Sequence, residues 1–287
     1  MRNLLKKVLI TFAFAIVIQG VTNVNVDAAE VKKVTRLTVH NGDNKNLLLQ
    51  WRKQEGAGYV IYRSEKKKTG YKKAGTLKNS YWADVDYEYV QWVDTKVKKN
   101  HKYYYKVKAY QYIDGNKVHG DFSKVKGSTV KATSKVSLCY DALPIINKER
   151  SKEGLRRVLW DFKADNGAIV RAKEISKEFD HTRPNGKDCL SAYKGANTCS
   201  ENIGYGYISV KSCIYAWLNS VGHRGWILCG YTEDIVAGKY GLMYGKNYDK
   251  SLEPGEVLPG DVCGISVTTY KSYYDYVFTK IVDNLYS

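Results

Sequence analysis

The segment FDHTRPNG, residues 179–186, decides how the second half of the chain is interpreted. It places a histidine, an arginine and an Asn-Gly turn directly after a stretch with helical periodicity. Two later segments have the same character, SENI at 200–203 and AWLNSVGHR at 216–224. Together they supply His181, Glu201 and His223, each close to an expected helix end or turn. Such connecting positions often carry functional side chains, so we expect the three to converge on one cleft.

The apolar spacing around these segments predicts three helices. The first has apolar positions at 138, 142, 145 and 146 and ends at Gly154. The second has apolar positions at 164, 168, 172, 175 and 179, with Asp161 as its expected cap. The third runs from about 209 to 220 with Ser209 as its N-cap. Expected strands at 235–241 and 264–269 follow these helices, which favours an α+β domain over residues 136–287.

Residues 33–132 show short strands instead of helical spacing. In the run 103–110, Tyr105, Val107 and Ala109 alternate with Lys106 and Lys108, as in a strand with one buried face. Several such strands, separated by turn residues, predict a β-sandwich of about 100 residues. A short polar linker near 131–136 would join the sandwich to the second domain, leaving room for a hinge but little for free tumbling.

This front part resembles a bacterial fibronectin type III module. The residues that carry the resemblance are Trp51 on an early strand, GYVIYR at 58–63, and Tyr103 ahead of YKVKA at 105–109. The resemblance implies that Tyr103 forms the family's tyrosine corner. It also implies a spacer or binding surface and not a catalyst.

The second part resembles a CAP domain, from the superfamily of cysteine-rich secretory, antigen and pathogenesis-related proteins, also called the SCP domain. The residues that carry it are INKER at 146–150, LWD at 159–161 and the three segments quoted above, in the family's order. The bacterial branch is the most similar. The resemblance implies an α-β-α sandwich whose cleft holds the motif histidines and glutamate. Ser220 stands where many eukaryotic members have a second glutamate, and the tail from about 245 shows no match.

The N-terminus predicts export. Basic residues at 2, 6 and 7 precede an apolar run at 8–18, and small residues allow cleavage after Ala28. We interpret residues 1–28 as the signal peptide of a secreted protein, which could associate with the cell wall after export. An uncleaved membrane anchor is the alternative. No lipidated cysteine follows the signal, and no later stretch is long enough for a transmembrane segment.

The positive charge lies in the front part of the chain. Residues 31–134 hold 23 Lys and Arg against 9 Asp and Glu, whereas residues 135–287 hold 20 against 18. For an exported protein this predicts a cell-envelope polyanion or another anionic surface as the partner, and not nucleic acid. The lysine runs at 66–68 and 96–99 could provide the contact, or could simply be solvated loop charges.

Six cysteines, at 139, 189, 199, 213, 229 and 263, all lie in the second part. The even number and an oxidising compartment permit disulfides. The sequence contains no Cys-x-x-Cys pair, so a zinc ribbon is not expected. A bridge between Cys189 and Cys199 would fix the loop between the first motif histidine and the glutamate. Buried free thiols are the alternative.

The chemistry of the expected cleft leaves two functions open. His181, Glu201 and His223 form a ligand set for zinc or another divalent metal with an open position. A binding protein would hold a metal or small ligand there, with Arg183, Asn202, Ser220 and Arg224 as further ligand-binding candidates. The alternative is a metal-assisted extracellular hydrolase acting on cell-wall or host polymers, with the same trio as catalytic candidates. A third alternative is purely structural: the histidines would join the cleft walls by hydrogen bonds, and the arginines would form ion pairs.

Overall fold

The computed structural model describes residues 31–42, 46–79, 88–131, 136–155, 157–194, 198–204, 207, 209–228, 262–270 and 275–282. Within the compact unit that begins at Val31, these ranges form two sandwich sheets and a mixed region of helices and strands. The expected signal peptide at 1–28, the strand predicted at 235–241 and most of the expected linker lie outside the described residues. None of the helices in these ranges combines the length and apolar character needed to cross a bilayer.

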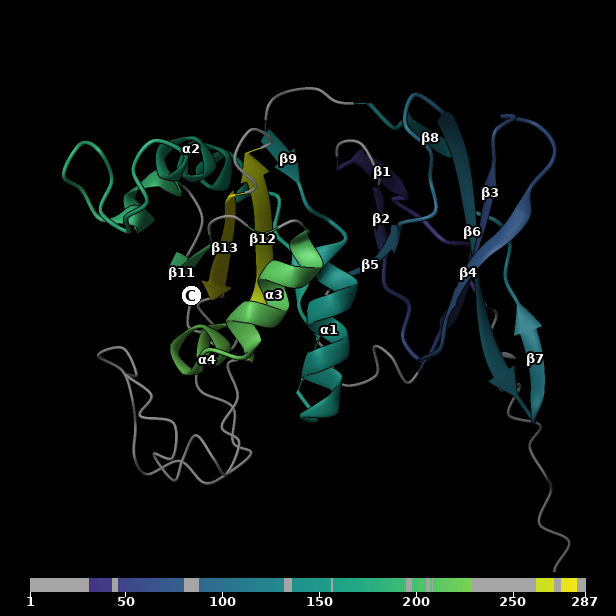
Figure 1. Cartoon of the computed structure of the whole chain (residues 1–287). Helices are drawn as coiled ribbons and strands as arrows, with labels where there is room; N and C mark the ends of the chain where they lie inside the picture. The colour runs from purple at the N-terminus through teal and green to yellow at the C-terminus, as the bar shows by residue number, and fades with distance from the viewer. Residues whose placement is uncertain are drawn as a thin grey trace, which may run out of the picture. The chain divides into compact units, whose positions relative to one another are not determined.

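The front part folds into two antiparallel sheets (Figure 1). One sheet has the order β1-β2-β5. The other has the order β4-β3-β6-β7, with β8 also paired to β6. The strands of the first sheet are β1 (Thr38–Asn41), β2 (Leu47–Arg52) and β5 (Tyr89–Asp94), and those of the second are β3 (Gly58–Ser64), β4 (Lys72–Leu77), β6 (Lys102–Ile113), β7 (Asn116–His119) and β8 (Lys126–Thr129). The arrangement fits the predicted β-sandwich.

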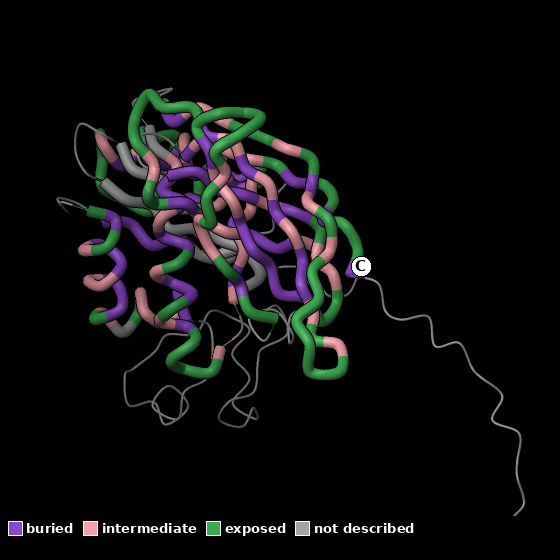
Figure 2. The backbone as a smooth tube through the Cα atoms, turned by 90° about the vertical axis from the view of Figure 1, so that its right-hand side faces the viewer, coloured by how far each residue is buried: buried purple, intermediate pink, exposed green. Residues whose placement is uncertain are grey.

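The alternation predicted for β6 is confirmed. Tyr105, Val107 and Ala109 are fully buried in a cluster that also contains residues of β2 and β3. Lys106 and Lys108 lie between them and are only partly buried. Figure 2 shows this change between buried and less buried positions along the strands. The sandwich core is therefore built from alternate residues of each sheet, as a half-buried strand requires.

Tyr103 makes the contact that a tyrosine corner requires. Its side chain is buried, and its hydroxyl oxygen accepts a hydrogen bond of 3.1 Å from the backbone N–H of Lys98. A tyrosine corner bonds back to the backbone a few residues upstream in this way. The contact fixes the start of β6 to the loop that precedes it.

The second part combines helices with a five-stranded sheet of order β10-β12-β13-β11, with β9 paired to β12 (Figure 1). Helix α2 contacts β12 and β13, whereas α3 contacts α1 and α4. This fits the predicted α+β domain. Its elements are β9 (Val136–Leu138), α1 (Ala142–Lys152), β10 (Leu159–Trp160), α2 (Asp165–Ile175), the 3₁₀ helix η2 (Cys189–Ala192), β11 (Thr198–Gly204), α3 (Val210–Leu218), α4 (Val221–Leu228), β12 (Val262–Tyr270) and β13 (Asp275–Val282).

The predicted start of α3 is confirmed, but both ends of α2 differ from the prediction. Ser209 caps α3, since its side chain accepts a bond from the backbone N–H of Ser212. Asp161 does not cap α2; it accepts from the backbone N–H of Lys163 and holds the turn before the helix. Phe179 is 48% exposed and lies beyond the last residue of α2. Phe179, which the sequence placed on the apolar face of this helix, therefore lies in the segment that follows it.

A buried glutamine joins the sandwich to the second part. The Gln91 side chain donates to the Trp160 carbonyl oxygen at 2.9 Å and accepts from the Trp160 backbone N–H at 2.7 Å. Leu48 of β2 also packs in the cluster formed by α1, α3 and α4. Because Gln91 satisfies both polar groups of a buried residue, it is part of the fold and not an incidental surface contact.

We predict that Gln91→Leu lowers the free energy of unfolding by about 1–3 kcal/mol, because it leaves buried polar groups of Trp160 without partners. Gln111→Leu is the matched control: the Gln111 side chain donates only to the Glu55 carbonyl at an exposed site of the sandwich. The control should change stability by no more than about 0.5 kcal/mol. Denaturant unfolding measures both, and equal effects would contradict the importance of the buried joint.

Candidate functional site

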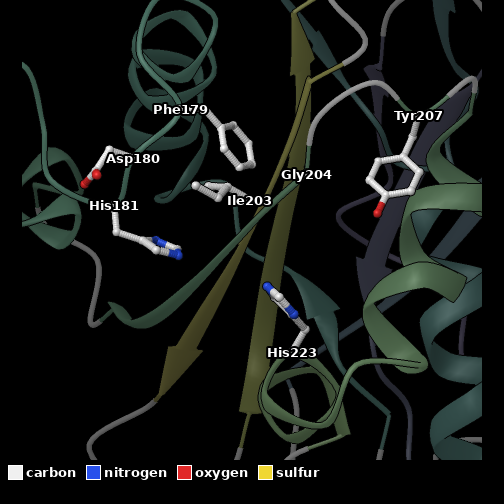
Figure 3. A pocket seen from close by; sticks show the side chains of 7 residues that line it. All are labelled: Phe179, Asp180, His181, Ile203, Gly204, Tyr207 and His223. Carbon is white, nitrogen blue, oxygen red and sulfur yellow. The ribbon is translucent and has the colours of Figure 1, made fainter.

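A pocket of about 520 Å³ lies where the end of β11, the loop after α2 and helix α4 meet. Figure 3 shows His181 and His223 reaching toward this space from different elements. Both motif histidines therefore line one pocket, whereas Glu201, the third residue expected in the cleft, is not among its lining residues. The lining residues are Phe179, Asp180, His181, Ile203, Gly204, Tyr207 and His223.

Glu201 is fixed behind the pocket by a buried arginine. The side chains of Glu201 and Arg171 are both 0% exposed. Arg171 Nε donates to Oε2 at 2.9 Å and Nη2 donates to Oε1 at 3.0 Å. This two-point pairing joins α2 to β11 and holds the carboxylate plane in one orientation. The sequence analysis did not single out Arg171; its only local signal is a charge beside the apolar positions of α2.

Glu201 in turn orients His181. The His181 Nδ1 atom lies 3.1 Å from Glu201 Oε1, while the imidazole itself is 54% exposed. Burial acts to raise the pKa of Glu201, but the hydrogen bonds from His181 and Arg171 outweigh it and lower the pKa overall. An ionised carboxylate only accepts hydrogen bonds, so Nδ1 carries the proton. The other ring nitrogen, Nε2, is left for the pocket.

His223 is oriented by a neutral group. Its Nδ1 lies 2.7 Å from Ser220 Oγ, and the Asn202 side chain donates to the His223 backbone carbonyl at 3.0 Å. Burial lowers the pKa of His223, and the electrostatic interaction with His181 lowers it further. Two residues proposed as ligand-binding, Asn202 and Ser220, therefore hold His223 in place. The imidazole is neutral near pH 7, which is the form that binds metals.

Both carboxylate oxygens of Glu201 already accept hydrogen bonds. Its Oε1 accepts from Arg171 and His181, and its Oε2 accepts from Arg171 and more weakly from Tyr193 at 3.4 Å. A carboxylate offers about four lone-pair directions, so a metal ion at Glu201 would have to displace one of these donors. Glu201 is therefore built to orient His181 in this arrangement.

Cys189 is a site residue that the sequence analysis missed. Ligand atoms of His181, Cys189 and Glu201 lie within 4.8 Å of one another, so this group could hold a metal ion. His223 is not part of it. Burial and the charge of Glu201 raise the pKa of the Cys189 thiol to about 12. A metal bound here would have to displace the thiol proton and compete with Arg171 for Glu201.

The proposed bridge between Cys189 and Cys199 is wrong for this structure, because Cys189 is a buried free thiol. Cys213 is also a buried free thiol. Burial raises the pKa of Cys213, which matches the alternative of small buried side chains. Cys229 and the side chains of Cys199 and Cys263 lie outside the described residues.

The two arginines expected near the cleft make ion pairs. Arg183 Nη2 lies 2.7 Å from Glu174 Oε1. Arg224 Nη2 lies 2.7 Å from Glu153 Oε1. Neither arginine lines the pocket. The carboxylate that does line it is Asp180, which belongs to the opening sequence segment but was not singled out there.

Two solved structures show a distant likeness to the chain. The chain is 12% identical to one titled "Myokine structure", at a TM-score of 0.27, covering 35% of this chain and 98% of that one. It is 16% identical to a β-1,2-glucanase from Parabacteroides distasonis, at a TM-score of 0.28, covering 53% of this chain and 23% of that one. TM-scores this low carry no argument about fold or function. Among curated proteins, none matches the chain.

The sequence model of the cysteine-rich secretory protein family, CAP, matches residues 143–235. The matched range contains α1, α2, β11, α3 and α4, and with them both pocket histidines, Glu201 and Arg171. The match supports a CAP-domain protein, with the CAP domain in this part of the chain.

Proposed function

We propose that this is a secreted CAP-domain protein whose pocket binds a divalent metal ion such as zinc through His181 and His223. Its fibronectin type III-like sandwich adheres to an anionic surface. CAP proteins are generally secreted, which supports the first part of the proposal together with the predicted signal at 1–28. The contact of Tyr103 with the Lys98 backbone supports the module assignment.

One observation carries the metal proposal: both histidines line one pocket while their Nδ1 atoms are engaged elsewhere. His181 uses Nδ1 for Glu201, and His223 uses Nδ1 for Ser220. Glu201 keeps the proton of His181 on Nδ1, and His223 can hold its proton on Nδ1 by donating it to Ser220 Oγ. Nε2 of each ring then keeps its lone pair for a metal. Metal-binding histidines commonly have their second nitrogen held by a carboxylate or another acceptor in this way.

The assignment gives Glu201 an orienting role. Two imidazole ligands would leave further positions of a tetrahedral metal open for water or a small ligand. Asp180 at the pocket lining adds negative charge, and the hydrogen bonds from Thr182 lower its pKa and keep it ionised. The pocket therefore offers neutral nitrogen donors beside a carboxylate, a combination suited to a divalent cation.

We predict that the protein binds one Zn²⁺ and that His223→Ala or His181→Ala reduces the affinity below the range measurable by calorimetry. His101→Ala is the matched control, since His101 bonds only the Lys99 carbonyl in an exposed part of the sandwich. Cys189→Ser should retain zinc binding. Loss in Cys189→Ser with retention in His223→Ala would move the metal to the group of His181, Cys189 and Glu201.

We predict that Glu201→Gln has a separate effect on stability. At neutral pH it removes one of the two carboxylate partners of the buried Arg171, the other being Glu174, and we expect a cost of about 1–3 kcal/mol. In whatever protein remains folded, zinc affinity should fall by about 10–100-fold, as for other groups that orient a metal ligand. His181→Gln removes an exposed partner of Glu201 and should cost about 1 kcal/mol or less.

The stability difference between the wild type and Glu201→Gln should depend on pH. The pKa of Glu201 is lowered in the folded state from its ordinary value of 4.5. Its ionised form therefore stabilises the fold above about pH 4.5, and this contribution is lost as the pH falls through the lower folded pKa. Denaturant unfolding between pH 7 and pH 3 should show the two proteins converging. A constant difference would contradict the charged pair as its source.

A further inference from the structure

The basic charge of the sandwich is concentrated in one of its two sheets. Strands β3, β4, β6, β7 and β8 contain no aspartate or glutamate. The sheet of β1, β2 and β5 contains one arginine and one aspartate. The eight basic residues of the five-stranded sheet are Arg63, Lys72, Lys73, Lys102, Lys106, Lys108, Lys117 and Lys126.

Several of these lysines share the outer face of the sheet with aromatic rings. Tyr62 of β3 is paired with Lys106 of β6 on one side and with Lys73 of β4 on the other. Paired residues of neighbouring strands project to the same face. Lys108 lies two residues after Lys106, and the residues that alternate with them are buried in the core. We call the surface formed by Tyr62, Lys73, Lys106, Lys108 and Phe122 the basic-aromatic face.

The rings hold the ammonium groups in place. The Nζ atom of Lys106 lies 3.8 Å from the centroid of the Phe122 ring, and that of Lys108 lies 5.4 Å from it. Tyr62 packs edge-on against Phe122 at 5.3 Å between centroids. Within the described residues, no ion pair engages Lys106 or Lys108. Their charges are positioned by cation–π contacts and stay available to an anion.

We propose that the basic-aromatic face binds a linear anionic polysaccharide. The inference rests on the adhesive role proposed for the sandwich, and it names the site and the class of partner. Outward positions two residues apart on β6 are separated by about 7 Å, and the whole twelve-residue strand is about 40 Å long. A sugar chain lying along β6 can pair its carboxylates or sulfates with successive lysines. Its apolar ring faces can pack on the partly exposed Tyr62 and Phe122.

The composition of the face favours a polysaccharide over the other common polyanions. Seven of the eight basic residues are lysines, which act as compact point charges, whereas bidentate reading of bases relies on arginine. The rings are partly buried within the sheet face, a position that suits contact with a chain and not insertion into a bilayer. The predicted signal at 1–28 also directs the chain to a compartment where anionic polysaccharides occur.

The test uses heparin, a sulfated uronic-acid polymer, as the probe in a fluorescence titration at about 0.15 M salt. The variant Lys73→Gln/Lys106→Gln/Lys108→Gln should bind heparin at least about 10-fold more weakly than the wild type, since three lysine contacts on the same face of the sheet are lost. The matched control is Lys66→Gln/Lys67→Gln/Lys68→Gln, which removes the same charge from exposed loop positions. The control should stay within about 2-fold of the wild type, and circular dichroism shows whether both variants are folded.

The other outcomes separate this inference from the proposal beneath it. Equal weakening in both variants would show attraction by net charge alone and would overturn the basic-aromatic face. Heparin binding that neither variant changes would overturn the face but leave adhesion in place. No binding by the wild type would overturn both. Tighter binding to single-stranded DNA or to phosphatidylserine vesicles of equal charge would overturn the polysaccharide as the partner.

Phe122→Leu tests the rings without changing the charge. We expect heparin affinity to fall about 3–10-fold, because the ammonium groups of Lys106 and Lys108 lose the ring that they share and keep only their contacts with Tyr71 and Tyr62. Phe162→Leu is the control, since Phe162 stacks on His40 at 4.2 Å, away from the strands of the face. An unchanged affinity in Phe122→Leu would overturn the aromatic part of the site.

Discussion

The candidate site depends on the buried ion pair between Arg171 and Glu201. The guanidinium of Arg171 meets both oxygens of Glu201 and also pairs with Glu174, while Tyr193 supplies a further donor to Glu201. The pair joins α2 to β11, and the oriented carboxylate then sets the ring of His181. An arrangement of this kind adds little stability over apolar packing, but removal of one partner is costly. Its value in this protein is orientation: it fixes where a histidine on a connecting loop can point.

The two histidines of the pocket are therefore held in different ways. His181 is hydrogen-bonded to an ionised carboxylate, whereas His223 is hydrogen-bonded to the hydroxyl of Ser220. Ser220 stands where many eukaryotic CAP domains have a second glutamate, so this chain lacks one negative charge at that point. Without an anionic partner to oppose them, burial and the electrostatic effect of His181 both lower the pKa of His223. The departure from the family pattern thus keeps the second imidazole neutral and available as a nitrogen donor.

Sequence reasoning succeeded where the information is local and failed where it is not. The alternation in β6 and the Ser209 cap depend on neighbours a few residues away, and both were predictable. Arg171 was missed because only its partner thirty residues later explains a buried charge on α2. Gln91 was missed for the same reason, with a partner sixty-nine residues away. The wrong prediction that Asp161 caps α2 has a different cause. Its carboxylate accepts a hydrogen bond from the backbone N–H of Lys163 in the turn before the helix, and an aspartate can bind such an N–H as readily as one at a helix end.

The joint at Gln91 relates the two functional surfaces to each other. The positive charge lies on the sandwich and the pocket lies in the CAP domain, so the proposed adhesion and the proposed metal binding belong to different parts of the chain. If a flexible linker were the only connection, attachment of the sandwich would leave the pocket free to turn. Gln91 instead pairs with both backbone groups of Trp160, and Leu48 packs among the helices of the second part. A polymer bound along β6 would then hold the pocket at a constant orientation, which a tether without these contacts could not do.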